Sequence, residues 1–114
     1  MCGICGEIRF DSTTPDEGMI HRMMDRLARR GPDSEGCVID GNVGLGHRRL
    51  AIIDLSDNAR QPMVDQQNGL ALVFNGTIYN YPELRAELIA KGHRFVSSGD
   101  TEVILKSYAE WGIE

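Results

Sequence analysis

The first ten residues, MCGICGEIRF (residues 1–10), carry the pattern that decides the fold. From Ile4 to Phe10 hydrophobic and polar side chains alternate, which predicts a β-strand. One face of this strand carries Ile4, Ile8 and Phe10, and the other carries Glu7 and Arg9. Cys2 therefore stands directly before a strand, close to the start of the chain.

A helix is expected between Thr14 and Gly31. Thr14 suits the N-cap position and Pro15 the first helical position, while Gly31 and Pro32 end the helix. Hydrophobic residues recur at helical spacing at Met19, Ile20, Met23, Met24 and Leu27.

Strands and then helices fill the rest of the chain. A hairpin is predicted from strands 37–40 and 43–48, followed by strands 50–54 and 70–74, with a polar loop over 56–62 and a turn at 68–69. A helix over 82–91, a short strand over 93–96 and a second helix from residue 101 to Gly112 follow. That last helix shows Ile104, Tyr108 and Trp111 at the helical spacing i, i+4 and i+7. The mixture predicts an α+β fold.

Composition excludes several classes of protein. The 114 residues are 41% hydrophobic and 25% charged, which is typical of a globular domain. A formal net charge of −5 without a dense basic stripe argues against nucleic acid as a partner, and no hydrophobic run is long enough to cross a membrane. Charged residues interrupt the N-terminus before a secretory signal can form, and three cysteines make no disulfide framework. We therefore expect a cytoplasmic protein.

Cys2 is the candidate nucleophile. Removal of Met1 would leave Cys2 with a thiol, whose reference pKa is about 8.5, and a free α-amine, whose reference pKa is about 7.7–8.0. The amine can take the thiol proton and later return it to a leaving group, so one residue supplies both nucleophile and base.

The spacing of Cys2 and Cys5 also allows other interpretations. A CxxC pair can be a redox couple or half of a metal site, and Cys2 can be an inert thiol. A redox CxxC normally opens a helix after a strand, whereas here the strand follows the pair. A zinc site needs two more ligands, and only Cys37 and three scattered histidines remain. We expect no metal site, and we expect Cys5 and Cys37 to be ordinary buried residues.

Five segments carry a resemblance to a known family: MCGICG (1–6), RGPD (30–33), GHRRLAIID (46–54), FNGTIYNY (74–81) and GDTEVIL (99–105). In this order they resemble the class II glutamine amidotransferase domain of asparagine synthetase-like enzymes. The resemblance covers essentially the whole chain, and five motifs in register are far more specific than any one of them.

The resemblance implies a role for each matching position. Cys2 would attack the side-chain amide of L-glutamine, which gives a γ-glutamyl thioester and ammonia. The Asn75 side chain and the Gly76 backbone N–H would form the oxyanion hole. Arg49 would bind the substrate α-carboxylate and Asp100 the α-ammonium. The remaining glutamine-binding positions would be Leu50, Ala51, Ile52, Ile53 and Thr77, in addition to Asn75 and Gly76.

Each of these positions also has an ordinary interpretation. Asn75-Gly76 alone is typical of a turn, an isolated arginine such as Arg49 is typical of a solvated face, and Asp100 is a good helix N-cap. We expect Arg48 to be an exposed neighbour of Arg49 on the opposite strand face. Arg30 and Asp33 are expected to be structural ties near the nucleophile.

One position departs from the family pattern. Thr77 stands where the family commonly has a glutamate that helps hold the substrate ammonium, so Asp100 remains the main anion there. This change and the opening residues are similar to the N-acetylglutaminylglutamine amidotransferase branch. The ammonia acceptor expected by resemblance is aspartate, with an amide-capped dipeptide as the second candidate.

The resemblance also implies an architecture. The family fold is that of an N-terminal-nucleophile hydrolase, an αββα sandwich of two antiparallel sheets. We expect residues 1–114 to be the N-terminal part of such a domain, incomplete in this chain, with unpaired strand edges and uncovered hydrophobic faces. ATP and Mg²⁺ are expected only in a missing synthetase domain, which would be a partner in cis or in trans, and a homodimer is a further expected assembly. The competing hypothesis is a catalytically inactive fragment or binding module of the same fold.

Overall fold

The computed structural model describes residues 2–51 and 56–113. Its elements are β1 (Gly3–Ile8), α1 (Glu17–Arg26), β2 (Ser34–Asp40), β3 (Val43–Arg49), the 3-10 helix η1 (Asp57–Ala59), β4 (Met63–Asp65), β5 (Leu70–Leu72), α2 (Tyr81–Ala90) and α3 (Thr101–Trp111). None of these helices combines the length and hydrophobicity that a membrane-spanning helix needs. The predicted α+β class is confirmed.

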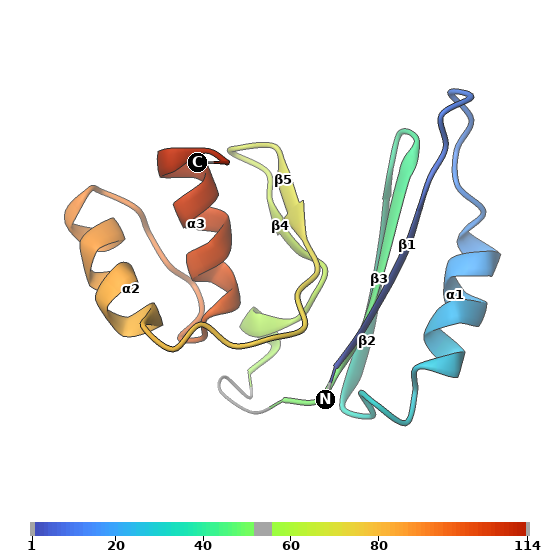
Figure 1. The fold of residues 1–114 in the computed structure, drawn as a ribbon, viewed down its shortest axis with the longest axis horizontal. Coiled ribbons are helices and arrows are strands. Elements are labelled where there is room, and N and C mark those ends of the chain that lie inside the picture. Colours follow the sequence, from blue (N-terminus) through green and yellow to red (C-terminus); the bar gives the residue numbers. More distant parts are fainter. Residues whose placement is uncertain (1, 52–55, 114) are drawn as a thin grey trace.

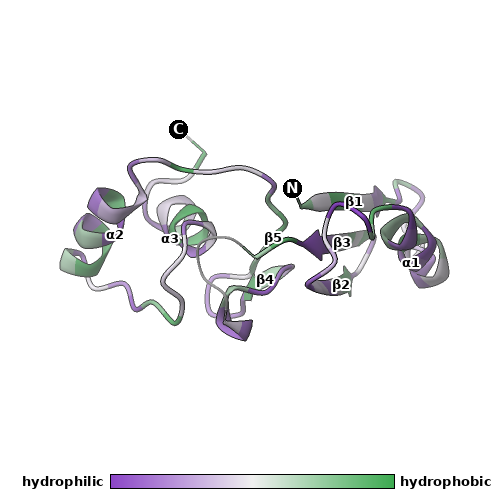
Figure 2. Cartoon of the chain, turned by 90° about the horizontal axis from the view of Figure 1, so that it is seen from below, coloured by the Kyte–Doolittle hydropathy of each residue, from purple (hydrophilic) through white to green (hydrophobic). Residues whose placement is uncertain are grey.

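Two antiparallel sheets form the centre of the molecule. The first has the strand order β1-β3-β2, and the second is the β4-β5 hairpin. Helix α1 covers the outer face of the first sheet, and α3 lies behind the hairpin with α2 beyond it (Figure 1). Figure 2, which is coloured by hydropathy, shows the same succession from below. The layers therefore follow the expected order of helix, sheet, sheet and helix.

Glycines in β3 allow α1 to pack closely on the first sheet. A Cβ atom at Gly46 would lie 2.9 Å from Ile20 Cγ2 and 3.0 Å from Met24 Cγ, and one at Gly44 would lie 2.3 Å from Ile20 Cδ1. Ile20 and Met24 are fully buried in this contact. Each such buried side chain stabilises the fold by roughly 1.5–3 kcal/mol.

The opposite face of β1 is open. The structure confirms the alternation of β1, but Ile4, Ile8 and Phe10 are 48%, 54% and 92% exposed. Gly3, Cys5 and Glu7 instead form the face that α1 covers. No described residue pairs with the outer edge of β1, which is an edge strand of the first sheet. The expected uncovered hydrophobic face and unpaired strand edge are therefore both present.

Helix α1 is shorter than its predicted range. The Asp16 side chain accepts a hydrogen bond from the backbone nitrogen of Gly18 at 2.9 Å, so Asp16 is the N-cap, and the prediction of Thr14 was wrong. The helix ends at Arg26, and a turn then leads to Gly31. Pro15 precedes the helix and is buried.

The second half of the chain differs from prediction in several elements. Residues 93–96 form no strand, whereas β4 was not predicted. Leu50 and Ala51 are outside any strand, and the rest of the predicted 50–54 strand lies outside the described residues. In α3 the helical spacing of Tyr108 and Trp111 does not mark a buried face, because these side chains are 49% and 41% exposed. The buried residues of α3 are Thr101, Glu102, Val103 and Leu105.

Candidate functional site

The backbone of Leu50 holds the Cys2 sulfur. The nitrogen of Leu50 lies 3.3 Å from Cys2 Sγ, and the thiol can donate to the Leu50 carbonyl at 3.6 Å. On the other side, Arg30 Nε donates to the carbonyl oxygen of Cys2 at 3.1 Å. Cys2 is half-buried and free of any disulfide. These contacts fix the position of Cys2 against the residue that follows β3.

Arg49 lies on the same face of the first sheet as Cys2. The register pairs Ile4 with His47, and side chains two residues apart share a face, so Cys2, Ile4, His47 and Arg49 all face the second sheet. Arg49 is 7% exposed, and its Nη1 atom donates to the carbonyl of Ser56 at 2.9 Å. The structure thus places Cys2 and the buried Arg49 on the same face of the first sheet.

The residues after Arg49 are held by Asp33. Asp33 Oδ2 accepts from the nitrogen of Ala51 at 2.7 Å, and the nitrogen of Asp33 donates to the carbonyl of Arg49 at 2.9 Å. Leu50 and Ala51 therefore have fixed backbone positions near Cys2. The other two residues predicted in this segment, Ile52 and Ile53, lie outside the described residues.

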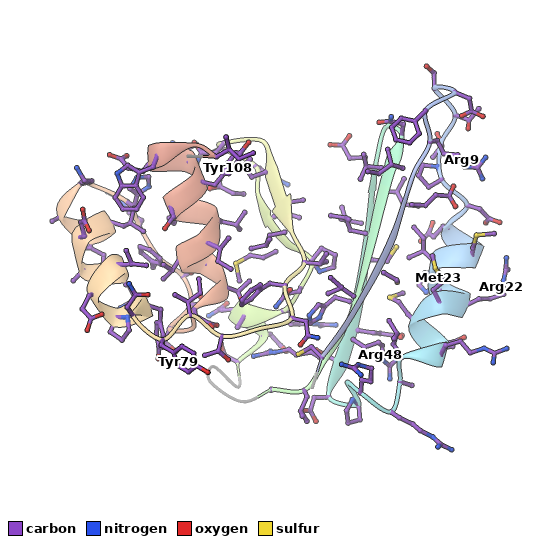
Figure 3. The ribbon with its side chains drawn as sticks, viewed as in Figure 1. Arg9, Arg22, Met23, Arg48, Tyr79 and Tyr108 are labelled. Carbon is purple, nitrogen blue, oxygen red and sulfur yellow. The ribbon has the colours of Figure 1, made fainter. Side chains whose placement is uncertain are left out.

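Arg48 points away from this site, as predicted, but it is not exposed. Its Nε donates to the carbonyl of Gly31 at 3.0 Å, and its Nη1 lies 2.5 Å from Glu35 Oε2. The side chain is only 15% exposed. Figure 3 shows it at the lower end of the sheet, near the turn after α1. The prediction of an exposed Arg48 was wrong because a carbonyl and a carboxylate lie within its reach.

Asn75 and Gly76 follow the end of β5 in an exposed segment without regular structure. The Asn75 side chain makes no hydrogen bond within the part of the chain that the structure describes, so its amide can donate to a ligand. A Cβ atom at Gly76 would lie 2.9 Å from Cζ of Phe74, because the Phe74 ring packs against this glycine. Tyr79, a few residues further on, is labelled in Figure 3 along the lower edge of the view, the side on which the N-terminus also lies (Figure 1).

Asp100 contacts this segment through its carboxylate. It occupies the N-cap position of α3 and makes no side-chain capping bond there. Its Oδ2 atom instead accepts from the backbone nitrogen of Ile78 at 2.9 Å, and the residue is 6% exposed. Thr77 is exposed and has no hydrogen-bond partner among the described residues. Thr77 and Asp100 are both predicted to bind the substrate. They lie close together, because Asp100 binds the backbone of Ile78, the residue that follows Thr77.

Two residues near the site were not predicted from the sequence. His47 Nε2 lies 3.1 Å from the carbonyl oxygen of Phe74, and Gln61 Oε1 accepts from the nitrogen of Phe74 at 2.5 Å. Burial lowers the pKa of His47, the hydrogen bond to Phe74 opposes this shift, and the charge of Arg49 adds to it. The signal that could have identified His47 is its position two residues before Arg49, on the same face of a strand.

The sulfur atoms of the CxxC pair face opposite sides of the sheet. Cys5 lies on the face covered by α1, where its thiol is 3.9 Å from the carbonyl of Ile20, whereas Cys2 faces the second sheet. Burial raises the pKa of the Cys5 thiol. Burial also raises the pKa of the Cys37 thiol, and the negative charge of Glu17 adds to that shift. This geometry favours neither a redox couple nor a shared metal for Cys2 and Cys5.

One group of described side chains could hold a metal ion. The ligand atoms of Glu17, His21 and Cys37 lie within 4.8 Å of one another, on the far side of the first sheet from Cys2. Glu17 and His21 are exposed and lie 3.5 Å apart as an ion pair of adjacent helical turns. Exposed acidic groups commonly lie near such residues without an ion, so a surface contact between Glu17 and His21 is the simpler interpretation.

Two cavities of the structure lie away from these residues. One of about 400 Å³ separates the sheets and is lined by Val43, Leu45, Val64 and Leu70 among others. One of about 560 Å³ lies beside α3 and is lined by Lys91, His93, Lys106 and Glu110 among others. Neither contains a residue predicted for the site.

Comparison with known proteins gives a consistent result. Residues 1–114 match the family described as the glutamine amidotransferase domain. Asparagine synthetase (glutamine-hydrolyzing) 3 of Bacillus subtilis is 42% identical over 97% of the chain, and asparagine synthetase (glutamine-hydrolyzing) 1 of the same organism is 43% identical over 97%. Asparagine synthetase (glutamine-hydrolyzing) 1 of Arabidopsis thaliana is 36% identical over the whole chain. The chain spans 18%, 18% and 19% of the lengths of these relatives.

Proposed function

This chain belongs to the glutamine amidotransferase domain family, and from that membership we propose that it hydrolyses L-glutamine with Cys2 as the nucleophile. The carrying observation is the position of Cys2. Its sulfur is held by the backbone of Leu50, the residue that follows the buried Arg49. A nucleophile and a carboxylate-binding group thereby face the same space.

The reaction begins with activation of the thiol. Once Met1 is removed, the α-amine of Cys2 accepts the thiol proton, and the N–H of Leu50 stabilises the thiolate at 3.3 Å. Arg30, through the Cys2 carbonyl, keeps the residue in place. The sulfur then bonds to the side-chain carbonyl carbon of glutamine, whose oxygen takes the negative charge.

Two hydrogen-bond donors stabilise that negative charge. The Asn75 side-chain amide and the Gly76 N–H supply the oxyanion hole, and each such donor contributes on the order of 3 kcal/mol in measured cases. Collapse of the intermediate breaks the carbon–nitrogen bond, and the protonated α-amine gives its proton to the leaving ammonia. Water then attacks the thioester, which releases glutamate and returns the thiol.

In this proposal the protein selects glutamine by binding the two charged groups on its α-carbon. Arg49 has guanidinium N–H groups besides the one bound to Ser56, and these can pair with the α-carboxylate. The Asp100 carboxylate keeps lone pairs beyond the bond from Ile78, so it can accept the α-ammonium, with Thr77 adding a neutral hydroxyl. The backbone of Leu50 to Ile53 forms part of the same pocket in this proposal.

The wider setting of the domain belongs to the same proposal. Residues 1–114 would be the N-terminal part of a type 2 glutamine amidotransferase domain in the cytoplasm. The ammonia would go to a synthetase domain, in cis or in trans, that amidates a carboxylate such as aspartate or a dipeptide. ATP and Mg²⁺ would act there, since the chain contains no Ser-Gly-Gly pyrophosphate loop, and no step at Cys2 needs them.

An inactive binding module of the same fold is the second candidate. Thr77 in place of the acidic residue of the family pattern and the exposed Ile4, Ile8 and Phe10 favour it. A glutaminase assay on the mature protein separates the two, with Cys2→Ala as the control. Ammonia release that depends on Cys2 supports the enzyme. Absence of turnover, or turnover that survives Cys2→Ala, supports the module or another nucleophile.

A further inference from the structure

We propose that His47 and Gln61 are positioning residues for the glutaminase reaction, and this inference rests on the function proposed above. They hold the backbone of Phe74 from both sides and thereby fix the two oxyanion-hole donors that follow it. Neither side chain is assigned to contact glutamine.

Phe74 depends on these two side chains because, within residues 2–51 and 56–113, no strand pairs with it. Strand β5 ends at Leu72, which pairs with Met63. Beyond that point the N–H of Phe74 donates to Gln61 Oε1 at 2.5 Å, and its carbonyl lies 3.1 Å from His47 Nε2. Two side chains thus replace the bonds that a neighbouring strand would supply.

His47 is anchored in the centre of the first sheet. It lies in the middle strand, between Ile4 and Gly36, and is fully buried. Because burial favours the neutral ring, its Nε2–H donates to the Phe74 carbonyl, which leaves Nδ1 as a buried acceptor without a partner among the described residues. His47 therefore connects the sheet that bears Cys2 and Arg49 to the segment that bears Asn75.

Gln61 connects the same point to α3. It is 8% exposed, and its Nε2 donates to Thr101 Oγ1 at 3.3 Å, next to Asp100. Its backbone passes close to β2, since a Cβ atom at Gly36 would lie 2.3 Å from the Gln61 carbonyl oxygen. One buried amide thus ties the oxyanion segment to the helix whose N-cap residue, Asp100, carries the proposed ammonium-binding carboxylate.

The position of Phe74 constrains the two oxyanion-hole donors, Asn75 and Gly76. Its peptide carbonyl, held by His47, belongs to the same planar unit as the Asn75 nitrogen. Its ring packs against Gly76, where a Cβ atom would come within 2.9 Å. Fixing Phe74 therefore limits the movement of both Asn75 and Gly76.

This arrangement predicts a specific kinetic defect. Oxyanion donors act on the transition state and not on bound glutamine, so looser donors lower kcat and leave KM unchanged. A displacement of about 1 Å can cost roughly a hundredfold in rate. We expect His47→Leu and Gln61→Leu to lower kcat by about 10- to 100-fold. His47→Gln, whose terminal amide can reach the same carbonyl, restores much of it.

The test compares these variants with matched controls in the full chain. His93→Leu and Gln67→Leu change the same residue types outside the Phe74 contacts, at a histidine paired with Glu110 and at an exposed glutamine. Alongside kcat and KM, inhibition by glutamate γ-semialdehyde is measured. This aldehyde adds to the thiol and places an oxyanion in the hole. We expect its affinity to fall in parallel with kcat, while alkylation of Cys2 by iodoacetamide keeps its rate.

Three outcomes separate this inference from the proposed function. Equal losses in kcat, glutamine affinity and Cys2 alkylation would overturn it, because they indicate general damage. Unchanged kcat in both leucine variants would also overturn it. If the unaltered protein has no glutaminase activity, the proposed function fails, and amide hydrogen exchange then decides. Faster exchange confined to residues 74–77 in His47→Leu supports the positioning role, and unchanged exchange there refutes it.

Discussion

Cys2 Sγ and the backbone nitrogen of Leu50 lie 3.3 Å apart, although 48 residues separate them in the sequence. This contact places the sulfur beside the segment that bears Arg49. We predict that Cys2→Ser lowers glutamine turnover at least about a thousandfold, because a hydroxyl is far less acidic than a thiol and the adjacent amine cannot activate it. Ammonia release from L-glutamine measures the effect.

The other cysteines provide the control for this prediction. Cys5→Ser changes a thiol on the α1 side of the sheet, so it should cost about 1 kcal/mol of unfolding free energy and leave turnover within about twofold. If Cys5→Ser were as inactive as Cys2→Ser while remaining folded, the assignment of the nucleophile to Cys2 would be wrong.

Arg49 and Arg48 offer a comparison between adjacent residues on opposite faces. We predict that Arg49→Lys raises the KM for glutamine by about 10- to 100-fold, since a hydrogen bond to a charged group contributes roughly 1.5–3 kcal/mol and lysine cannot make the bidentate pair. Arg48→Lys should leave KM unchanged, because Arg48 pairs with Glu35 away from Cys2. Steady-state kinetics over a range of glutamine concentrations test both, and equal KM values in the two variants would contradict the prediction.

Asp100 and Thr77 test how the substrate ammonium is held. Asp100→Asn keeps an oxygen for the N–H of Ile78 but removes the negative charge, so we predict a KM increase of about tenfold or more with little change in stability. Thr77→Glu adds a carboxylate at an exposed position and should lower KM. A KM that responds to neither change would place the ammonium elsewhere. Thermal unfolding of each variant serves as the stability control.

The local elements of the fold could be predicted because their signals are local. The hairpin of β2 and β3 turns at Gly41, which has a φ of +59°, and this glycine beside Asn42 is visible in the sequence. Strand β4 has three residues and no pattern long enough to detect. The alternation of β1 was also visible, but it could not reveal which face α1 would cover. Gly44 and Gly46 on the neighbouring strand decide that by admitting Ile20.

The site could be predicted only in part, for a similar reason. Cys2, Arg49 and Asp100 stand in motifs that the sequence displays. His47 and Gln61 act through the backbone of Phe74. His47 is 27 residues from Phe74 in the sequence and Gln61 is 13, so no local sequence pattern predicts either contact. Strand β5 stops at Leu72, before the predicted end at Phe74, because its partner β4 begins at Met63, opposite Leu72.

A substitution at Gly31 tests whether close packing against the backbone of Arg48 and Arg49 stabilises the fold. A Cβ atom there would lie 2.3 Å from the backbone carbon of Arg48 and 2.4 Å from the nitrogen of Arg49. Because backbone atoms cannot move aside as a flexible side chain can, we predict that Gly31→Ala lowers the unfolding free energy by about 2–3 kcal/mol. Gly18→Ala, in the first turn of α1, should change it by less than about 1 kcal/mol. Chemical denaturation measures both, and similar values for the two would refute the packing argument.

His47 should make the stability of the protein depend on pH. Burial holds its pKa below 6.5, against the opposing effect of the Phe74 carbonyl, and the charge of Arg49 lowers it further. In the unfolded chain His47 titrates near 6.5, so below that pH the unfolded state binds more protons than the folded one. The unfolding free energy should therefore be level above pH 7 and fall on acidification from about pH 6.5, by at most about 1.4 kcal/mol per pH unit from this group. Denaturation of the unaltered protein and of His47→Gln between pH 5 and pH 8 tests this. The variant should lose that slope, His93→Gln should keep it, and an equal slope in all three proteins would show that His47 is not its source.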